Sequence, residues 1–291
     1  GFHTIYSCRS AFRHEIRARG WNGIRVTPLL GAGMNLESGH LNVRLARSEE
    51  DRRSAERLRY KVFVEELGGD GPLVDHDNRF ERDNFDPIYD QLVLVDDRLD
   101  TEGLEHVVGV YRLLMDERAT EHGFYSEGEY DLAVLRSSGR RLLELGRSCV
   151  APEHRGGLGL HMLWKGLADY VRQHQAEVLF GVASLHGTSI ESLALPLSHL
   201  HNAFLAPPDL RVRAVEHAYQ PMDLVPPAEI DRVAAMRAVP PLIKSYLRLG
   251  GFVGDGAFVD HAFNTTDICL VMDTAQMNMR ALARFTAGTP Q

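Results

Sequence analysis

The chain has 291 residues, 44% of them hydrophobic and 25% charged, so it can bury a large core in one elaborate domain or two small ones. Its net charge of −8 does not favour nucleic-acid binding, and no apolar run approaches the ~18 residues that span a bilayer. Three cysteines (Cys8, Cys149 and Cys269) without a CxxC pair are typical of a reducing compartment. We therefore expect a cytoplasmic protein with no nucleic-acid partner.

The first 40 residues differ from the rest. They contain five arginines against Glu15 and Glu37, followed by the loose Gly31-Ala32-Gly33. We interpret residues 1–40 as a basic N-terminal appendage, with a basic helix lying on a membrane surface as the alternative. Residues 41–291 then form the functional domain.

The first half of this domain begins with a strand and a helix and continues with two strands. Apolar alternation predicts a strand at 41–46, and helical spacing predicts a helix at 49–67 that Gly68 and Gly69 end. Residues 70–87 form a polar, aspartate-rich loop. Strands are predicted at 91–95 and 107–114, followed by a mixed segment to residue 141.

The central stretch, residues 142–171, reads as a strand, a glycine-rich turn and a helix. The apolar strand 142–150 carries Glu144 and Arg147, and Pro152 stops it. Helical spacing of apolar residues begins at Leu160. A helix N-terminus exposed by glycines offers unpaired N–H groups and a favourable dipole to an anion.

The second half contains a strand at 177–184, a helix at 188–201 interrupted by Pro196, and helical segments within 230–250 on either side of Pro240. A hairpin is predicted from 251–259 and 267–272, and a closing helix at 276–285. The order predicts a mixed α/β (α+β) fold, a mixed central sheet flanked by helices, with a C-terminal elaboration from about residue 185.

The glycine-rich turn excludes two phosphate-binding motifs. It lacks the Gly-Lys-Ser/Thr ending of a P-loop, and its glycines do not follow the dinucleotide-binding spacing. It resembles the acyl-donor loop of the GCN5-related N-acyltransferase (GNAT) superfamily. Gly157 and Gly159 fill the glycine positions of that loop, His154 replaces the usual Gln or Arg, and Arg155 stands beside it. The resemblance implies that these four residues bind the acyl donor.

Other segments refine the resemblance. Some resemble the acyl-homoserine-lactone synthases, namely 58–68, Asp83-x-x-Asp86, 109–114 and Glu144-x-x-Arg147. Others resemble the ornithine-lipid N-acyltransferases, namely 145–150, 179–184, 240–250, Asp255-Gly256 and 264–268. Together they cover about residues 41–273. The resemblance implies transfer of a 3-hydroxyacyl group from acyl carrier protein to the α-amine of L-ornithine, giving lyso-ornithine lipid.

This reaction gives roles to the charged residues. An amine that attacks a thioester must first lose a proton, and ornithine brings two ammonium groups and one carboxylate. We expect Glu144 and Arg147 to be catalytic, and a set of four residues to bind substrate: Arg59, Asp83, Asp86 and Arg112. Glu144 and Arg147 lie three apart, so a β-bulge is needed to bring them together. A structural ion-pair role remains open for both.

Several other residues have two interpretations. Cys149 is either a nucleophile or, as we favour, a small buried strand residue. His199 and His201 lack a third metal ligand, and the aspartates at 75 and 77 do not give a calcium loop, so no metal site is predicted.

Two surfaces have open interpretations as well. The apolar residues of 242–249 either line an acyl tunnel or pack in the core. Arg155, Lys165 and Arg172 either dock the acidic carrier protein or keep the surface soluble.

Three alternatives to ornithine acylation remain open: acylation of glutamine or another amino acid, acyl-homoserine-lactone synthesis, and an acyl- or carrier-binding module without catalysis. The resemblance implies no bound cofactor, because the acyl-phosphopantetheine of acyl carrier protein is itself the donor substrate. A membrane-destined product leaves peripheral contact with the inner membrane open.

Overall fold

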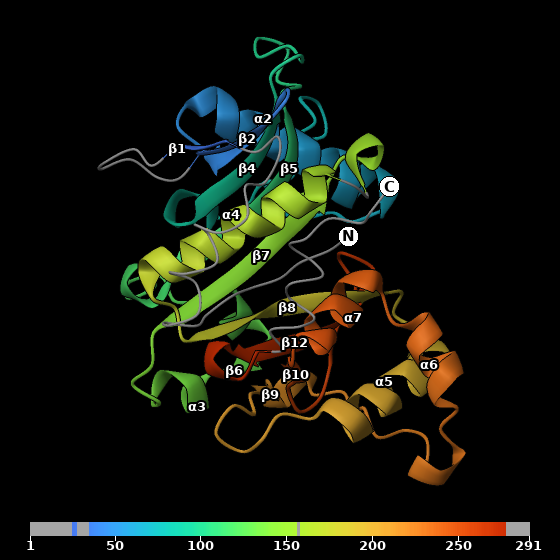
Figure 1. Ribbon diagram of the computed structural model, residues 1–291. Helices are drawn as coiled ribbons and strands as arrows, with labels where there is room; N and C mark the ends of the chain where they lie inside the picture. Colours follow the sequence, from blue (N-terminus) through green and yellow to red (C-terminus); the bar gives the residue numbers. More distant parts are fainter. Residues whose placement is uncertain (1–24, 28–34, 156–157, 278–291) are drawn as a thin grey trace.

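The computed structural model describes residues 25–27, 35–155 and 158–277, and its central feature is one long sheet (Figure 1). The strands are β1 (Arg25–Thr27), β2 (Asn35–Ser38), β3 (Leu41–Leu45), β4 (Asp90–Asp96), β5 (Val107–Met115), β6 (Tyr130–Asp131), β7 (Leu142–Val150), β8 (Val178–His186), β9 (Arg213–Ala214), β10 (Phe252–Val253), β11 (Phe258–Asp260) and β12 (Thr265–Asp273). The α-helices are α2 (Glu49–Arg59), α3 (Ala133–Arg136), α4 (Leu158–His174), α5 (Ile190–Phe204), α6 (Arg232–Ala238) and α7 (Pro241–Arg248).

The long sheet has the order β1-β2-β3-β4-β5-β7-β8-β12-β10, with β11 added on β12. Every pairing in it is antiparallel except that of β7 with β8. A small second sheet pairs β6 with β9. The predicted mixed sheet is thus confirmed, and its one parallel pair lies at the centre of the molecule.

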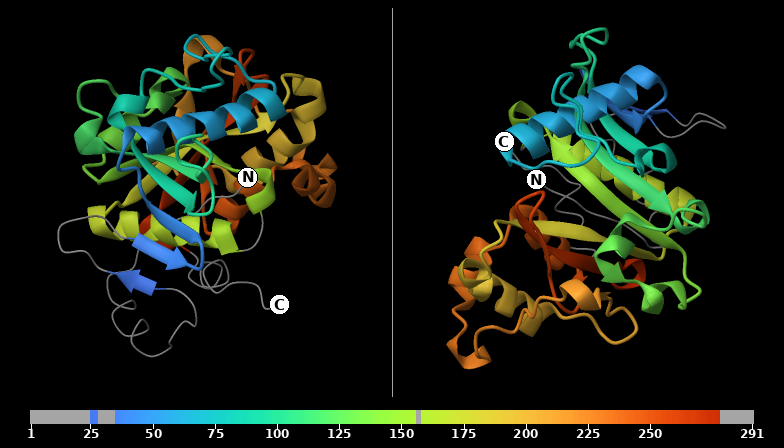
Figure 2. Two further views of the ribbon diagram at one scale, coloured as in Figure 1. Left: turned by 90° about the horizontal axis from the view of Figure 1, so that it is seen from above. Right: turned by 180° about the vertical axis from the view of Figure 1, so that it is seen from behind.

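Helices α2 and α4 cover opposite faces of the N-terminal half of this sheet, whereas α5, α6 and α7 gather at its C-terminal half (Figure 2). Ser48 caps α2 by accepting a hydrogen bond from the Asp51 N–H, which satisfies a donor that the helix leaves unpaired. The chain continues from α2 directly into a π-helix at Tyr60–Glu66. The predicted helix at 49–67 is therefore confirmed in extent, with a wider last part.

The predicted interruption at Pro196 is wrong, because α5 runs through it from Ile190 to Phe204. Proline removes one intrahelical hydrogen bond, but Pro196 is buried with Leu197 and Leu200, and this packing holds the helix together. The other predicted strands and helices within the described residues occur near their predicted bounds.

Strand β12 lies between two buried clusters. Ile268, Leu270 and Met272 belong to one, and Cys269 and Val271 to the other. Successive side chains of a strand point to opposite faces, so β12 is apolar nearly throughout although it carries Asp267. In the part of the chain that the structure describes, none of the helices has the length and apolar character to cross a bilayer.

Two predictions fall largely outside the described residues. The appendage at 1–40 is described only at β1 and from β2 onward, where β2 pairs with β3, and its boundary stays a prediction. The closing helix at 276–285 is described only to Met277, and residues up to Gln276 form a 3₁₀ turn.

Candidate active site

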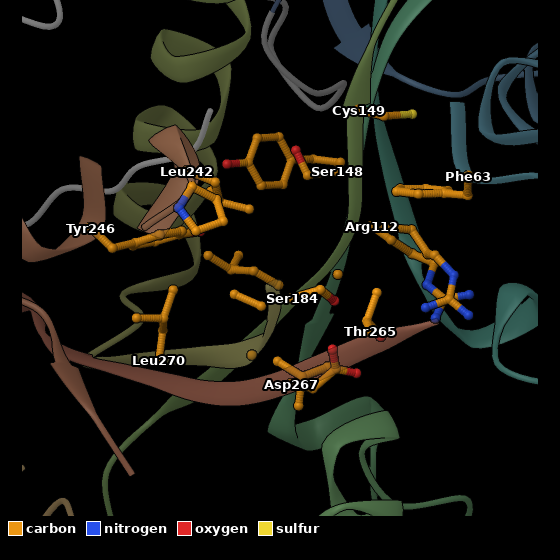
Figure 3. A pocket seen from close by; sticks show the side chains of 18 of the residues that line it. Phe63, Arg112, Ser148, Cys149, Ser184, Leu242, Tyr246, Thr265, Asp267 and Leu270 are labelled. Atoms are coloured by element: carbon orange, nitrogen blue, oxygen red, sulfur yellow. The ribbon is translucent and has the colours of Figure 1, made fainter. Parts of the chain in front are cut away.

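Strands β7 and β8 separate shortly after they pair. Their parallel pairing joins Leu142, Leu143 and Glu144 to residues 178–180 and then ends. A pocket of about 350 Å³ opens where they diverge. Its walls come from the π-helix, β7, β8, α7, β12 and the segment around Phe263 (Figure 3). Each strand therefore presents an edge to the pocket that the other strand does not pair.

A glycine sets the point of separation. A Cβ on Gly181 would lie 2.1 Å from the backbone oxygen of Leu145, far inside any real contact. Only glycine lets β8 approach β7 this closely at the start of the gap. Gly181 belongs to the segment 179–184 that resembles the ornithine-lipid N-acyltransferases. Its role in the structure is to let the backbones of β7 and β8 approach each other.

The predicted β-bulge is present on β7. The register of β5 against β7 shifts between Val110 and Arg112, and Arg147 has a φ of 45°. A left-handed backbone is uncommon for a non-glycine residue and redirects its side chain. The bulge does not bring Arg147 into an ion pair with Glu144, however, because Arg147 pairs with Glu81 and Asp83.

Arg59 lies at the centre of a buried charge network. Its side chain is fully buried, its Nε donates to Glu81 at 2.6 Å, and its Nη atoms donate to Asp86 at 2.5 and 3.0 Å. Burial disfavours the ionised form of Glu81, but the charges of Arg59 and Arg147 lower its pKa to about 2. These groups are therefore charged and paired at neutral pH.

Arg112 and Arg147 extend the network. Arg112 donates to Asp83 at 2.7 Å and to Asp86 at 3.2 Å, and Arg147 reaches Glu81 at 3.1 Å and Asp83 at 3.3 Å. Three guanidinium groups thus face three carboxylates. A buried network of this kind is strongly destabilised when one member is removed, because its partner is left charged and alone.

The network changes the interpretation of the predicted substrate-binding residues. Asp83 and Asp86, expected to bind substrate, have arginine partners inside the protein. Arg59 does not line the pocket, whereas Arg112 and Arg147 do. The sequence prediction brought these residues together correctly but missed Glu81, which the acidic loop around it gave no reason to single out.

Glu144 lies on the pocket wall and is nearly inaccessible to solvent, with 1% of its surface exposed. Its carboxylate accepts hydrogen bonds from the Tyr89 hydroxyl, from the Tyr125 N–H at 3.0 Å and from the Ser126 N–H at 2.7 Å. Burial raises its pKa although these donors oppose the rise. The carboxylate anchors the turn at 125–128 and is also held at a fixed place beside the pocket.

The predicted donor loop is described in part. Arg155 lines the pocket, donates from Nε to the Val150 carbonyl at 2.9 Å and binds both oxygens of Glu66. His154 instead contacts Asp96, with 3.3 Å between its Nε2 and a carboxylate oxygen. That Arg155 and His154 bind the acyl donor stays a prediction.

The two predicted glycines of this loop differ. Gly159 is the second residue of α4 and lies against Leu94, whose Cδ2 would be 3.0 Å from an added Cβ. It therefore serves close packing of the helix on the sheet, and its role toward the donor stays a prediction. Gly157 lies outside the described residues.

The structure bears on two interpretations that the sequence left open, those of Cys149 and of the apolar residues of 242–249. Cys149 is buried on β7, and burial raises its pKa to about 12, so a reactive thiolate is not available at neutral pH. In the helical stretch from 242 to 249, Leu242 and Tyr246 line the pocket, whereas Ile243 and Leu249 are fully buried in the core. One face of α7 therefore meets the pocket and the other packs.

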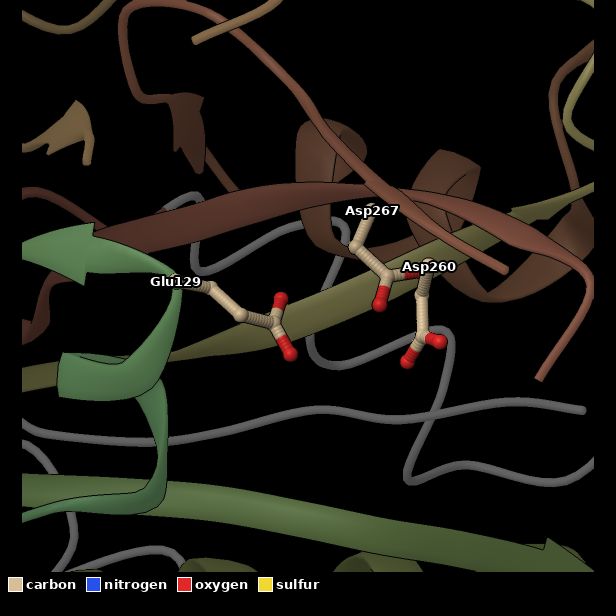
Figure 4. A group of neighbouring side chains, drawn as sticks. All are labelled: Glu129, Asp260 and Asp267. Atoms are coloured by element: carbon tan, nitrogen blue, oxygen red, sulfur yellow. The ribbon is translucent and has the colours of Figure 1, made fainter. Parts of the chain in front are cut away.

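Three further acids were missed by the sequence analysis: Glu129, Asp260 and Asp267. One carboxylate oxygen from each lies within 4.8 Å of the others (Figure 4). Asp260 and Asp267 line the pocket. A charged residue inside the apolar run of β12 was the available signal for Asp267, whereas Glu129 and Asp260 are brought to it only by the fold.

A mixed sheet whose parallel central strands splay around a pocket, beside a turn that leads into a helix, is the architecture of GNAT acyltransferases. The family model for the acetyltransferase (GNAT) domain matches residues 58–165. The match to the solved structure of the acyl-homoserine-lactone synthase LasI covers 87% of this chain and 98% of the LasI chain, with 15% identity and a TM-score of 0.46.

Relatives define the particular family. An L-ornithine N(alpha)-acyltransferase of Rhodobacter capsulatus is 60% identical over 237 residues, which is 81% of this chain and 91% of the relative. One of Brucella abortus is 42% identical over 252 residues, 86% of this chain and 90% of the relative. The chain therefore belongs to the L-ornithine N(alpha)-acyltransferase family.

Proposed function

We propose that this acyltransferase moves a 3-hydroxyacyl group from acyl carrier protein to the α-amine of L-ornithine, giving lyso-ornithine lipid. The observation that carries the proposal is that the pocket at the β7–β8 separation has two unlike ends. Leu242, Tyr246 and Leu270 line one side, and Arg112 and Asp267 lie on the other (Figure 3). A product with a fatty chain and a charged amino-acid head needs both.

The separated strands supply a place for the donor. A thioester arm inserted between β7 and β8 would meet the edge of β7 after Glu144, which β8 does not pair. Backbone N–H groups on this edge are the donors we assign to the oxyanion of the tetrahedral intermediate. The acyl chain then extends along Leu242 and Tyr246, where burial of each methylene stabilises binding by ~0.8 kcal/mol.

The amine reaches the thioester after it loses a proton. We assign this proton to Glu144, which lies on the pocket wall and whose pKa burial raises toward the range of a useful base. The nitrogen then attacks the thioester carbonyl, the C–S bond breaks, and the thiol of the carrier arm leaves with a proton. No covalent enzyme intermediate is needed.

The substrate carboxylate is assigned to Arg147. Its side chain is 14% exposed and lies in the pocket, with the rings of Tyr125 and Phe263 about 5 Å from its guanidinium carbon. Arg59 and Arg112 are 0% and 1% exposed and have their charges matched inside the network. Of these three arginines, Arg147 is therefore the one best placed to meet a carboxylate.

The experiment incubates the protein with a 3-hydroxyacyl carrier protein, separately with the matching acyl-CoA, and with a panel of amino acids. Mass spectrometry then identifies the amide. We expect acylornithine from the carrier-bound donor. If ornithine gives no product while glutamine or glycine is acylated, the proposed acceptor is wrong. If only acyl-CoA serves as donor, the carrier assignment is wrong.

A further inference from the structure

Glu129, Asp260 and Asp267 come from three separate segments and converge (Figure 4). Glu129 precedes β6, Asp260 ends β11, and Asp267 is the third residue of β12. Glu129 and Asp267 are only 5% and 4% exposed, and Asp260 is half-buried. Like charges this close repel one another, so the fold brings the three together against an electrostatic cost.

The group differs from the arginine network in what its oxygens contact. Oε2 of Glu129 and Oδ1 of Asp267 are buried, and neither has a hydrogen-bond partner among the described residues. A buried carboxylate oxygen without a donor is costly, because it has lost its hydration and gained nothing in exchange. Both oxygens are suited to accept from a ligand that brings its own N–H groups and positive charge.

The titration behaviour agrees with this geometry. Burial raises the pKa of Glu129, and the charges of Asp267 and Asp260 raise it further. Burial also raises the pKa of Asp267 to about 6, and Asp260 adds to the rise, whereas the Ser184 and Thr265 side chains and the nearby Arg147 oppose it. The positive charge of Arg147 opposes the rise at both of these carboxylates.

The group opens to the substrate. Asp260, Asp267 and Arg147 all line the same pocket, and the Arg147 charge acts on both Glu129 and Asp267. One cation and an acidic group therefore stand near each other in this pocket. That arrangement matches an amino acid with a carboxylate at one position and an ammonium group at the end of a short chain.

We propose that Glu129, Asp260 and Asp267 receive the side-chain ammonium group of ornithine and so select it over neutral amino acids. The proposal rests on the proposed function and adds the residues that set acceptor specificity. An ammonium group donates three hydrogen bonds in tetrahedral directions. At ~2.8 Å each, three acceptors would lie ~4.6 Å apart, which is compatible with oxygens that lie within 4.8 Å of one another.

The test compares ornithine with norvaline, which has the same carbon chain without the terminal amine. kcat/KM is measured for both acceptors in the wild type, in Asp267→Asn and in Glu129→Gln. Each variant keeps the shape of the side chain and removes its charge. We expect the wild type to prefer ornithine strongly. In each variant the preference should fall by about 10- to 100-fold, because kcat/KM falls for ornithine alone. Norvaline should change by less than about twofold.

The matched control is Asp209→Asn, the same substitution at an exposed position outside the pocket. It should leave both acceptors unchanged. An equal loss with ornithine and norvaline would assign the acids a structural role and overturn the proposal. A preference for ornithine over norvaline that stays unchanged in the variants would also overturn the proposal. If either buried variant fails to fold, Asp260→Asn at the half-buried member gives the same comparison.

Two further outcomes are distinguishable. If chelation abolishes the ornithine preference of the wild type and Mg²⁺ or Ca²⁺ restores it, the acids hold a metal and the proposal fails. If the wild type acylates norvaline or glutamine but not ornithine, the proposed function itself fails, and this assignment fails with it. If the wild type acylates ornithine and only the variants lose the preference for ornithine, the result supports both the proposed function and the assignment of the three acids.

Discussion

The charged residues around the pocket form two groups with different chemistry. In the first, Arg59, Arg112 and Arg147 balance Glu81, Asp83 and Asp86 through short contacts. In the second, Glu129, Asp260 and Asp267 have no such balance within the described residues. The first group stabilises the walls of the pocket and presents Arg147 to the substrate carboxylate, and the second is left to interact with the ammonium group of the substrate.

Glu144→Gln should lower turnover by about 10²–10⁴-fold, because an amide cannot accept the proton of the attacking amine. Binding of acyl carrier protein should stay within about twofold of the wild type, since Glu144 lies deep on the pocket wall. Single-turnover kinetics and calorimetric titration with the carrier measure the two quantities. Turnover that stays normal would remove Glu144 from the role of base.

A companion measurement separates chemistry from folding in this variant. A Gln side chain offers one acceptor oxygen where Glu144 offers two, so at least one donor among Tyr89, Tyr125 and Ser126 loses its partner. We expect a loss of about 1–3 kcal/mol in the free energy of unfolding. Asp209→Asn, at an exposed position outside the pocket, is the control and should change neither stability nor turnover.

Asp267→Asn should stabilise the unliganded protein at pH 7.5 by about 1–3 kcal/mol, although it removes acceptor selectivity. The folded-state pKa of Asp267 is raised to about 6, so its contribution to stability decreases as pH rises from about 4 to 6 and stays unfavourable above. The variant should lack this decrease. Denaturant unfolding of both proteins between pH 4 and 8 measures the difference.

The same titration predicts a pH dependence of substrate use. As pH falls through about 6, Asp267 gains a proton and loses its attraction for an ammonium group. The KM for ornithine should therefore rise more steeply below pH 6 than the KM for norvaline. Parallel curves for the two acceptors would contradict the assignment of Asp267.

At the residue level, the sequence predicted which residues cluster better than it predicted what they do. The resemblance brought Arg59, Asp83, Asp86 and Arg112 to one place, which the structure confirms. It did not reveal that they pair with one another, since an ion pair between a helix and a loop 27 positions later depends on how the loop packs. Glu129 meets Asp267 for the same kind of reason, across three separate segments.

Among the elements, β7 and β8 define the site by how they part. Gly181→Ala should destabilise the protein by about 2–4 kcal/mol, because the new methyl group would collide with the Leu145 carbonyl and not with a movable side chain. The control is Gly128→Ala, where an added Cβ meets nothing within 4 Å. It should change stability by less than about 1 kcal/mol, as measured by urea unfolding.

The extent of elements was predictable from periodicity, but their internal irregularities were not. Apolar spacing gave the helix at 49–67, whereas nothing in that spacing indicates its change to a π-helix at Tyr60, part of which lines the pocket. Pro196 predicted an interruption from local chemistry, and burial of α5 overrode it. The spacing of Glu144 and Arg147 led us to expect a bulge, but nothing in that spacing indicates that Arg147 has a positive φ.

For the whole molecule, the predicted contact with acyl carrier protein can now be tested with fewer changes. Arg155 is held by Glu66 and the Val150 carbonyl, so altering it would disturb the pocket. Lys165→Glu with Arg172→Glu on α4 should raise the KM for the carrier at least about fivefold, and added salt should reduce the difference. Arg52→Glu with Arg237→Glu is the control on other helices, and an equal effect there would contradict docking on α4.

The position of β12 in the sheet has a consequence for synthesis. Its residues pair with those of β8 about 80 to 95 positions earlier in the chain, and it also supplies Asp267. A ribosome releases the N-terminal part of the sheet long before β12 exists, so the nascent chain must wait with an open, apolar edge at β8. Completion of the fold therefore depends on the late pairing of β12 with β8. The edge of β8 is where a chaperone would protect the unfinished chain.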